Sequence, residues 1–201
     1  MRVLNLYAGV GGNRYLWKNV EVTAVEMNPK IAKVYSNQFP DDELVIGDAH
    51  QYLLDHSDEF DFIWSSPPCP THSRMMKATR HRLRFYPDMK LYEEILFLTH
   101  FYEGKWVVEN VVPYYKPLIK PSGSIGRHLF WGNVEIPEVT LPLKNNFIKT
   151  ATVGGRQVLF DWLEMEPFDE IVYLPNSHDP CRMLRNCVHP RIGEGFMSLI
   201  G

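Results

Sequence analysis

The stretch RVLNLYAGVGG, residues 2–12, decides the fold of this chain. Its first part is a short apolar run, and glycines at positions 9, 11 and 12 interrupt that run. Glycine adopts backbone conformations that other residues avoid, and it lets the chain approach a ligand closely. A strand that ends in such a turn is typical of the first strand of a ligand-binding α/β sheet.

Short apolar runs and helical patterns alternate after this stretch. Strand-like runs cover residues 20–25, 44–46, 60–64, 105–108 and 128–131. Helical spacing covers residues 29–39, 92–101 and part of 185–200. The alternation predicts an α/β fold with a doubly wound, mostly parallel sheet over residues 1–135. Residues 136–180, rich in Pro, Asn and Gly, are predicted to form a small irregular lobe, and residues 181–201 to return to the main domain.

The charge of the chain is segregated along the sequence. The net charge of −3 argues against indiscriminate nucleic-acid binding, but a local basic patch is compatible with it. Residues 62–87 contain no acidic residue and carry a basic block. The block consists of Arg74, Lys77, Arg80, Arg82 and Arg84. The three cysteines, and the lack of a long apolar segment or a secretory signal, favour a cytoplasmic protein without a membrane span.

Polar residues follow the second and third predicted strands. Glu26 ends the second, 17 positions after Gly9, a spacing that suits a carboxylate accepting hydrogen bonds from ribose hydroxyls. Asp48 follows the third and is positioned to accept from the exocyclic amine of adenine. The Gly-x-Gly-Gly spacing favours an adenosine-type ligand that lacks a pyrophosphate.

The fourth and fifth predicted strands end in chemically reactive side chains. Cys69 lies in Pro67-Pro68-Cys69-Pro70, where prolines stiffen the backbone. A cationic neighbourhood favours the reactive thiolate, and the basic block follows directly. A lone cysteine is more often a small packing residue, which is how we interpret Cys181 and Cys187. Glu109, after a buried strand, is interpreted as a carboxyl that donates to a ring nitrogen of a base once desolvation favours its protonated form.

These motifs, in this order, resemble those of the cytosine carbon-5 DNA methyltransferases. The resemblance rests on residues 5–12, Glu26 with Met27, Asp48, Pro67-Pro68-Cys69 and Glu109-Asn110-Val111. Residues 185–190 look like the last motif of that family, which completes the cofactor pocket. The resemblance covers most of residues 3–131 and 185–200. It implies a Rossmann-like methyltransferase fold, S-adenosylmethionine as cofactor and double-stranded DNA as partner.

The resemblance also implies residue roles. Cys69 attacks carbon 6 of a cytosine flipped out of the duplex, and Glu109 holds or protonates ring nitrogen 3. Asn110 and Arg127 complete the implied catalytic set. The implied cofactor set is Tyr7, Ala8, Gly9, Gly11, Gly12, Glu26, Met27, Asp48, Ala49, Pro67 and Asn186. The implied DNA contacts are Ser73 and the basic block, on a mobile loop over the base.

The sequence departs from the family pattern in four places. Asn5 stands where aspartate is usual, and residues 70–73 replace the more frequent Gln-x-Phe-Ser. The Gln-x-Arg-x-Arg motif is not clear; residues 124–130 are interpreted as its remnant, with Arg127 as the anion or base contact. The recognition region, residues 136–180, is short, which predicts a short or degenerate target site. Such a compact enzyme suits a phage or mobile element, with or without a restriction partner.

Other functions stay open at this point. Transfer-RNA cytosine methyltransferases share the Pro-Pro-Cys and Glu-Asn-Val motifs, and a non-catalytic cofactor- or DNA-binding module is a further alternative. Ser66-Pro67-Pro68 resembles the motif of amino methyltransferases, but Cys69 stands where that class has an aromatic residue. His178, Cys181, Cys187 and His189 do not have a familiar zinc spacing, so we predict no metal. We expect His72 and His81 to contact phosphate or solvent, and the chain to be a monomer.

Overall fold

A computed structural model describes residues 1–73, 86–142, 152–174 and 177–201 of the chain. The strands are β1 (Arg2–Leu6), β2 (Glu21–Glu26), β3 (Glu43–Ile46), β4 (Phe62–Ser65), β5 (Lys105–Val111), β6 (Gly123–Ile125) and β7 (His128–Gly132). The helices are α1 (Pro29–Gln38), α2 (Ala49–His56), α3 (Lys90–Phe101), α4 (Gly155–Leu163), α5 (Arg182–Arg185) and α6 (Pro190–Ile200), with a 3-10 turn at Ser57–Glu59.

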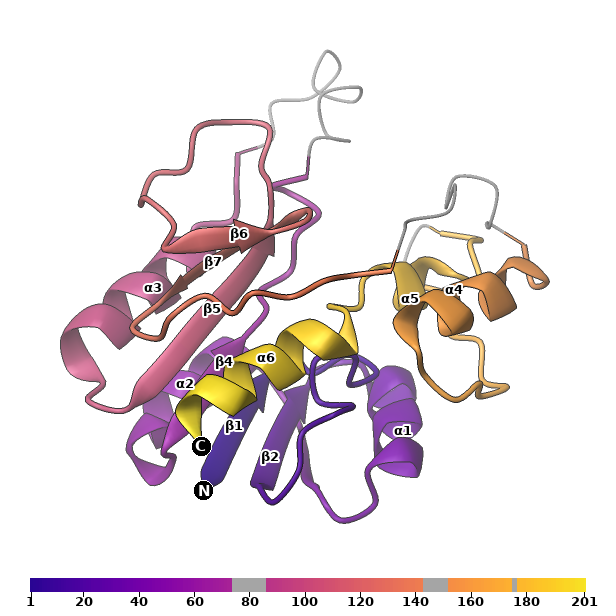
Figure 1. Cartoon of the computed structure of the whole chain (residues 1–201), viewed down its shortest axis with the longest axis horizontal. Helices are drawn as coiled ribbons and strands as arrows, with labels where there is room; N and C mark the ends of the chain where they lie inside the picture. Colours follow the sequence, from indigo (N-terminus) through magenta and orange to yellow (C-terminus); the bar gives the residue numbers. More distant parts are fainter. Residues whose placement is uncertain (74–85, 143–151, 175–176) are drawn as a thin grey trace.

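Within the described residues the strands form one sheet in the order β3-β2-β1-β4-β5-β7-β6 (Figure 1). The first five strands pair in parallel, and β7 runs antiparallel to both β5 and β6. The predicted α/β fold with a mostly parallel sheet is therefore confirmed. The strand order reverses between β1 and β4, and open α/β sheets bind ligands beyond the carboxyl ends of strands at such a point.

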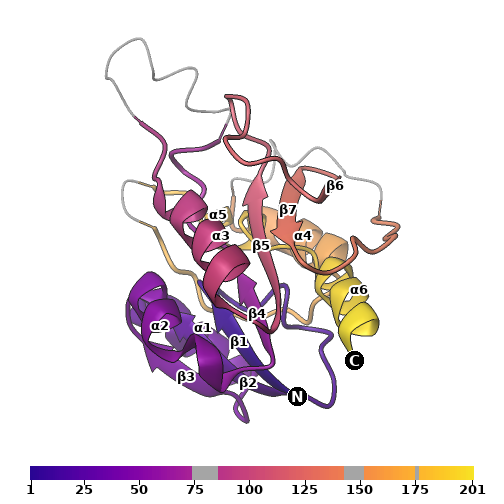
Figure 2. The ribbon, with the colours of Figure 1, turned by 90° about the vertical axis from the view of Figure 1, so that its left-hand side faces the viewer.

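Helices cover both faces of the sheet. Along β4, Ile63 packs in the cluster that includes α2 and α3, whereas Trp64 faces the opposite side. There the ring of Trp64 meets Phe196 of α6 edge-on, with ring centroids 5.4 Å apart. Figure 2 shows α3 and α6 on opposite sides of the sheet. This alternation buries both faces, as expected for a doubly wound sheet.

Local signals account for the starts of α1 and α6. α1 begins with Pro29, and the side chain of Asn28 accepts a hydrogen bond from the Lys30 amide at 3.0 Å. α6 likewise begins with Pro190. The helices predicted over residues 29–39 and within 185–200 are thereby confirmed. α2, which the sequence analysis did not predict, is short and buries only Ala49 and Leu53.

The region over residues 136–180 is less irregular than predicted, because it contains α4. Leu159 and Leu163 of α4 pack with Val34 of α1 and Leu184 of α5. Packing of this apolar face stabilises α4, although the sequence around α4 contains few of the polar residues that mark the ends of a helix. The buried Arg156 donates to the carbonyl oxygens of residues 168 and 170, which ties the following segment to the helix.

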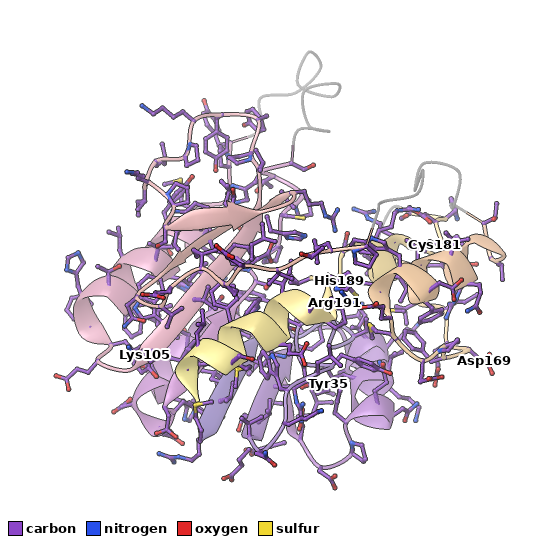
Figure 3. All side chains as sticks on the ribbon, in the orientation of Figure 1. Tyr35, Lys105, Asp169, Cys181, His189 and Arg191 are labelled. Carbon is purple, nitrogen blue, oxygen red and sulfur yellow. The ribbon has the colours of Figure 1, made fainter. Side chains whose placement is uncertain are left out.

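The start of α6 is joined to the end of α4. His189 Nδ1 accepts from the Arg191 amide, so its Nε2 carries the proton and donates to the Trp162 carbonyl at 2.8 Å. Arg191 also forms a two-pronged ion pair with Glu164. Figure 3 shows His189 and Arg191 between these helices. In the part of the chain that the structure describes, none of the helices is long and apolar enough to cross a membrane.

Candidate active site

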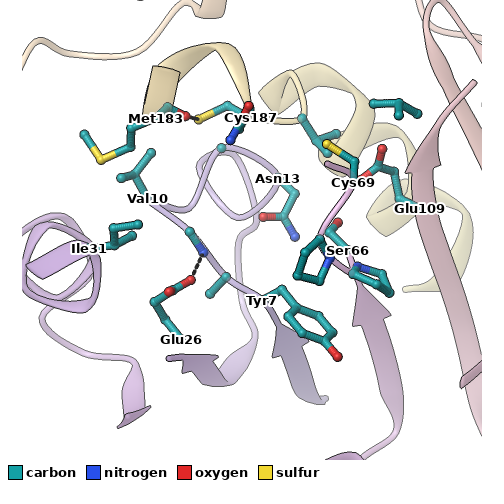
Figure 4. Close-up of a pocket in the computed structure, with 18 of the residues that line it drawn as sticks. Tyr7, Val10, Asn13, Glu26, Ile31, Ser66, Cys69, Glu109, Met183 and Cys187 are labelled. Carbon is teal, nitrogen blue, oxygen red and sulfur yellow. Dashed lines mark hydrogen bonds between the residues drawn. The ribbon is translucent and has the colours of Figure 1, made fainter. Parts of the chain in front are cut away.

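A pocket of about 340 Å³ lies beyond the carboxyl ends of β1, β2, β4 and β5. Figure 4 shows Glu26 at one end of it and Cys69 with Glu109 at the other, which we call the Glu26 end and the Cys69 end. Predicted cofactor residues that line it are Tyr7, Ala8, Gly9, Gly12, Glu26, Met27, Ala49, Pro67 and Asn186. Predicted catalytic residues that line it are Cys69, Glu109 and Arg127.

Backbone amides hold the carboxylate at the Glu26 end. Oε2 of Glu26 accepts from the Gly9 amide at 3.1 Å, and Oε1 accepts from the Asn28 amide at 2.8 Å. Gly9 has a φ of +57°, a conformation that L side chains rarely adopt and that aims its amide at Glu26. Burial raises the pKa of Glu26, while these amide hydrogen bonds oppose that rise. The carboxylate is therefore fixed in place at the edge of the pocket.

The turn at residues 9–12, which we call the glycine turn, packs directly against the C-terminal segment. A Cβ at Gly12 would lie 2.6 Å from the Val188 carbonyl oxygen and 2.8 Å from Cys187 Cβ. The absence of a side chain thus lets residues 186–188 form one wall of the pocket. Gly11, at φ +82°, faces the Phe39 ring instead and does not line the pocket.

Asp48, predicted as a cofactor contact, lies outside the pocket lining and caps α2. Its side chain accepts from the amides of His50 at 2.9 Å and Gln51 at 3.3 Å, and it pairs with Lys90 at 3.3 Å. Ala49, the first residue of α2, does line the pocket. The described position of Asp48 is that of a helix N-cap.

Cys69 sits on a tight turn after β4. Its carbonyl oxygen accepts from the amides of both His72 and Ser73 at 3.0 Å, and its side chain is half-buried at the pocket wall. Burial raises the pKa of the Cys69 thiol, and the neighbouring Glu109 raises it further, whereas Arg127 lowers it. The basic block predicted to supply positive charge lies outside the described residues.

Glu109 is buried near the end of β5 and is held by a histidine. Nδ1 of His128 lies 2.5 Å from Oε1 of Glu109, and both side chains are less than a tenth exposed. Arg127 donates from Nε to His128 Nε2 at 3.2 Å and from its guanidinium to the Arg185 carbonyl. The side chains of Arg127 and His128 therefore connect the Arg185 carbonyl of α5 to the Glu109 carboxylate.

Asn110, predicted as catalytic, connects two strand ends rather than lining the pocket. Its Nδ2 donates to the Pro67 carbonyl at 2.9 Å, and its Oδ1 accepts from the Val111 amide at 2.9 Å. Pro67 begins the turn that carries Cys69. Asn110 thus fixes the position of the Cys69 turn relative to Glu109, which directly precedes Asn110 on β5.

Several pocket residues escaped the sequence analysis. His128 lines the pocket next to Arg127, and Asn13 lines it just after the glycine turn. Asn13 Nδ2 donates to Oδ1 of the fully buried Asn5 at 2.8 Å, so Asn5 supports the glycine turn from inside the sheet. The only sequence signal for either residue was its position beside a predicted motif.

His72 was predicted to contact phosphate or solvent, and this prediction is wrong. Its ring is 1% exposed, and its Nδ1 lies 2.5 Å from the hydroxyl of Tyr115. Burial lowers the pKa of His72, so it behaves as a core residue that braces the turn after Cys69. Ser73 pairs with Pro113 in an isolated bridge, while the basic block and His81 lie outside the described residues.

The two other cysteines are packing residues, as predicted. Cys181 is completely buried and Cys187 is 7% exposed, although Cys187 also contributes to the pocket wall. Their thiols donate to separate carbonyl groups, those of Thr152 and Met183. Over the described ranges, no cluster of three or more His, Cys, Asp or Glu is arranged for a metal ion.

The arrangement of thiol, carboxylate and glycine turn agrees with a sequence comparison. The family model of C-5 cytosine-specific DNA methylases matches residues 1–113, more than half of the chain. The chain belongs to this family. A comparison with curated proteins found no match.

Solved structures resemble parts of this C-5 methylase chain. Spodoptera frugiperda DNMT2 is 24% identical over 55% of this chain and 35% of its own, with a TM-score of 0.41. An E. coli prophage-encoded protein described as a DNA modification methyltransferase is 21% identical over 58% and 33%, with a TM-score of 0.40. Entamoeba histolytica EhMeth is 17% identical over 55% and 38%, with a TM-score of 0.38. The chain thus matches about a third of the length of these proteins.

Proposed function

We propose that the chain transfers a methyl group from S-adenosylmethionine to carbon 5 of cytosine in double-stranded DNA, with Cys69 as the nucleophile. One observation carries this proposal: a thiol and a carboxylate share one end of the pocket that the glycine turn and Glu26 line at the other. The proposed covalent chemistry needs the nucleophile beside carbon 6 and the acid beside ring nitrogen 3 of the same base, with the methyl donor within reach.

The residues at the Glu26 end suit the proposed cofactor. Glu26 offers a carboxylate to ribose hydroxyls, and Val10, Ile31 and Met183 offer apolar surface to an adenine ring. A pocket of about 340 Å³ has the size of an ordinary small-molecule site, which spans roughly 300–1,000 Å³. When bound, S-adenosylmethionine supplies an electrophilic methyl group on a sulfonium.

At the Cys69 end the proposed reaction begins on the pyrimidine ring. The Cys69 thiolate forms a bond from Sγ to carbon 6, the ring electrons move toward nitrogen 3, and the Glu109 carboxyl gives its proton to that nitrogen. Carbon 5 is then the nucleophilic end of an enamine and forms a bond to the methyl carbon, while the bond from that carbon to sulfur breaks and S-adenosylhomocysteine leaves. Loss of the carbon-5 proton to a base and release of Cys69 restore the aromatic ring, and Glu109 regains its proton.

The cytosine has to leave the duplex to reach this site. Glu109 is buried and Cys69 is only half-buried, so a base inside a stacked helix does not reach both. We propose that Ser73 and the basic block contact the phosphates around the extruded base. The short region over residues 136–180 is proposed to read a short or degenerate target, as suits a phage or restriction-modification enzyme, in a cytoplasmic monomer.

Parallel methylation assays test the proposal. The purified chain is incubated with methyl-labelled S-adenosylmethionine and either unmethylated duplex DNA or transfer-RNA transcripts. We expect label in the DNA, and bisulfite sequencing then gives the modified cytosines and their context. Label in transfer RNA alone would mean that the substrate is RNA and not DNA. Cofactor binding without transfer to either would favour a binding module.

A further inference from the structure

The pairing of β5 with β7 brings a histidine against the proposed acid. In this antiparallel pair Glu109 lies opposite Phe130 and Val111 lies opposite His128. Glu109 and His128 are therefore diagonal neighbours on one face of the sheet, within reach of longer side chains. The distance from His128 Nδ1 to Glu109 Oε1 is 2.5 Å.

Arg127 fixes which nitrogen of His128 carries the proton. Its Nε is a donor only, and it lies 3.2 Å from His128 Nε2, so Nε2 accepts. A neutral ring then has its proton on Nδ1 and donates to Oε1 of Glu109. The guanidinium of Arg127 is itself held by the Arg185 carbonyl, which keeps the donor in place.

We propose that His128 is a positioning residue that orients Glu109 for proton transfer, in the neutral form with the proton on Nδ1. This inference rests on the proposed function. Because Oε1 receives the hydrogen bond from His128, the exchangeable proton of the Glu109 carboxyl resides on Oε2, the oxygen left for nitrogen 3 of the cytosine. His128 keeps its own proton throughout.

The same contact stabilises Glu109 after the transfer. Once Oε2 has given its proton to nitrogen 3, the negative carboxylate accepts a stronger, charge-assisted hydrogen bond from His128 Nδ1. Among the described residues, the charged and titratable groups near this contact include Glu109 on β5, Cys69 after β4 and Arg127 before β7. Arg182 and Arg185 of α5 also lie nearby, and Arg185 is paired with Asp179. The guanidinium of Arg127 lies on the Nε2 side of the His128 ring, and Glu109 lies on the Nδ1 side.

Variants of His128 test the orienting role. His128→Leu keeps apolar bulk but removes the donor, and we expect kcat for duplex DNA to fall about 10- to 100-fold, with KM within about threefold. His128→Asn keeps a donor near the Nδ1 position and is expected to recover kcat to within about fivefold of wild type. Leu129→Ala is the matched control, since Leu129 lies on the same strand but packs toward the other face.

The kinetic results decide between an orienting and a packing role. If His128→Leu retains wild-type kcat, or if His128→Asn is as slow as His128→Leu, the proposal is wrong. A fall in kcat for Leu129→Ala as large as that for His128→Leu would also overturn the proposal, because weaker packing of β7 would then explain both results.

A measurement on the free protein separates this inference from the proposed function. Nitrogen-15 NMR of the histidine rings, assigned with His128→Leu, distinguishes the two neutral forms and the imidazolium. We expect His128 to show a protonated Nδ1 and an unprotonated Nε2 at pH 7.5. The opposite tautomer or an imidazolium would overturn the inference. If His128 shows the expected tautomer but no methyl transfer is detected, only the proposed function is overturned.

Discussion

The two ends of the pocket are built in different ways. At the Glu26 end the carboxylate is held by backbone amides, and its partners lie 17 and 2 positions away in the sequence. At the Cys69 end side chains make the connections. Asn110 reaches Pro67 across 43 positions, and Arg127 reaches the Arg185 carbonyl across 58.

This difference predicts how each end responds to mutation. Backbone amides are present whatever the residue, so most substitutions leave the Glu26 end intact unless they change Glu26 or the glycine turn. Side-chain connections vanish with one substitution, and a buried partner is then left without its hydrogen bond. The Cys69 end should therefore contain more positions at which one change lowers the rate.

The sharpest test at the Cys69 end is Cys69→Ser. A hydroxyl is a far weaker nucleophile than a thiolate, so we expect methyl transfer to fall at least about a thousandfold while cofactor affinity stays near wild type. Labelled-methyl transfer and calorimetric titration measure the two quantities. Cys181→Ser is the control, because Cys181 is buried away from the pocket. Full activity of Cys69→Ser would refute the covalent route.

At the Glu26 end, Glu26→Gln should act on affinity and not on chemistry. The amide loses the charge and one acceptor, so we expect the dissociation constant for S-adenosylmethionine to rise about 10- to 100-fold. The rate at saturating cofactor should stay within about threefold. Glu21→Gln, at the exposed start of the same strand, is the control for the calorimetric titration. An unchanged affinity would mean that Glu26 only braces the glycine turn.

Asn110→Ala tests whether a side-chain connection positions Cys69. It leaves the Pro67 carbonyl without its donor, which should lower the free energy of unfolding by about 1–3 kcal/mol and kcat by about tenfold. Urea unfolding and labelled-methyl transfer measure both.

Asn133 offers a matched control at the other end of β5. It also donates to a carbonyl, that of Gly104, and accepts from an amide, that of Trp106. Asn133→Ala should lower stability without a comparable change in kcat. Equal losses of kcat in both variants would show that general softening, not the position of Cys69, sets the rate.

The smallest expected effect concerns the charge between Cys69 and Glu109. Burial and Glu109 raise the pKa of the Cys69 thiol, so the thiolate fraction at pH 7 is small and grows as the pH rises. We expect the rate of iodoacetamide labelling at Cys69, followed by mass spectrometry, to increase up to and beyond pH 9. In the free protein, before the carboxyl takes up the proton that the proposed reaction uses, Glu109→Gln removes a negative neighbour of Cys69, lowers that pKa and should accelerate labelling several-fold at pH 8. The exposed Glu103→Gln serves as control and should leave the rate unchanged. A slower rate in Glu109→Gln would contradict the charge interaction between Glu109 and the Cys69 thiol.

The parallel half of the sheet was predictable, because its strands are apolar runs that end in glycine or polar residues. α2 and α4 were missed for a physical reason: each is short and is stabilised by packing against other elements, α2 against β1 and α3, and α4 against α1 and α5. The signal for α2 was Asp48, which the sequence analysis assigned to the cofactor and which caps the helix.

The candidate site likewise contains residues that the sequence analysis found and residues that it missed. Cys69, Glu109 and Glu26 stand in contiguous motifs and were found. His128 was missed because its relation to Glu109 arises from the register of an antiparallel strand pair, which spacing along the chain does not reveal. His72 was assigned to the surface because it stands in a polar stretch, whereas the fold buries it against Tyr115.

The close approach of the glycine turn to residues 187 and 188 has a consequence for biosynthesis. The first strand leaves the ribosome early, but one wall of its pocket is encoded almost at the end of the described chain. At roughly 5–20 residues per second, about 10–40 seconds of translation separate the two. Until then the emerging chain carries its cysteine and carboxylate without an enclosed cavity. The proposed cofactor pocket therefore has this wall only after the chain has been synthesised through residue 188.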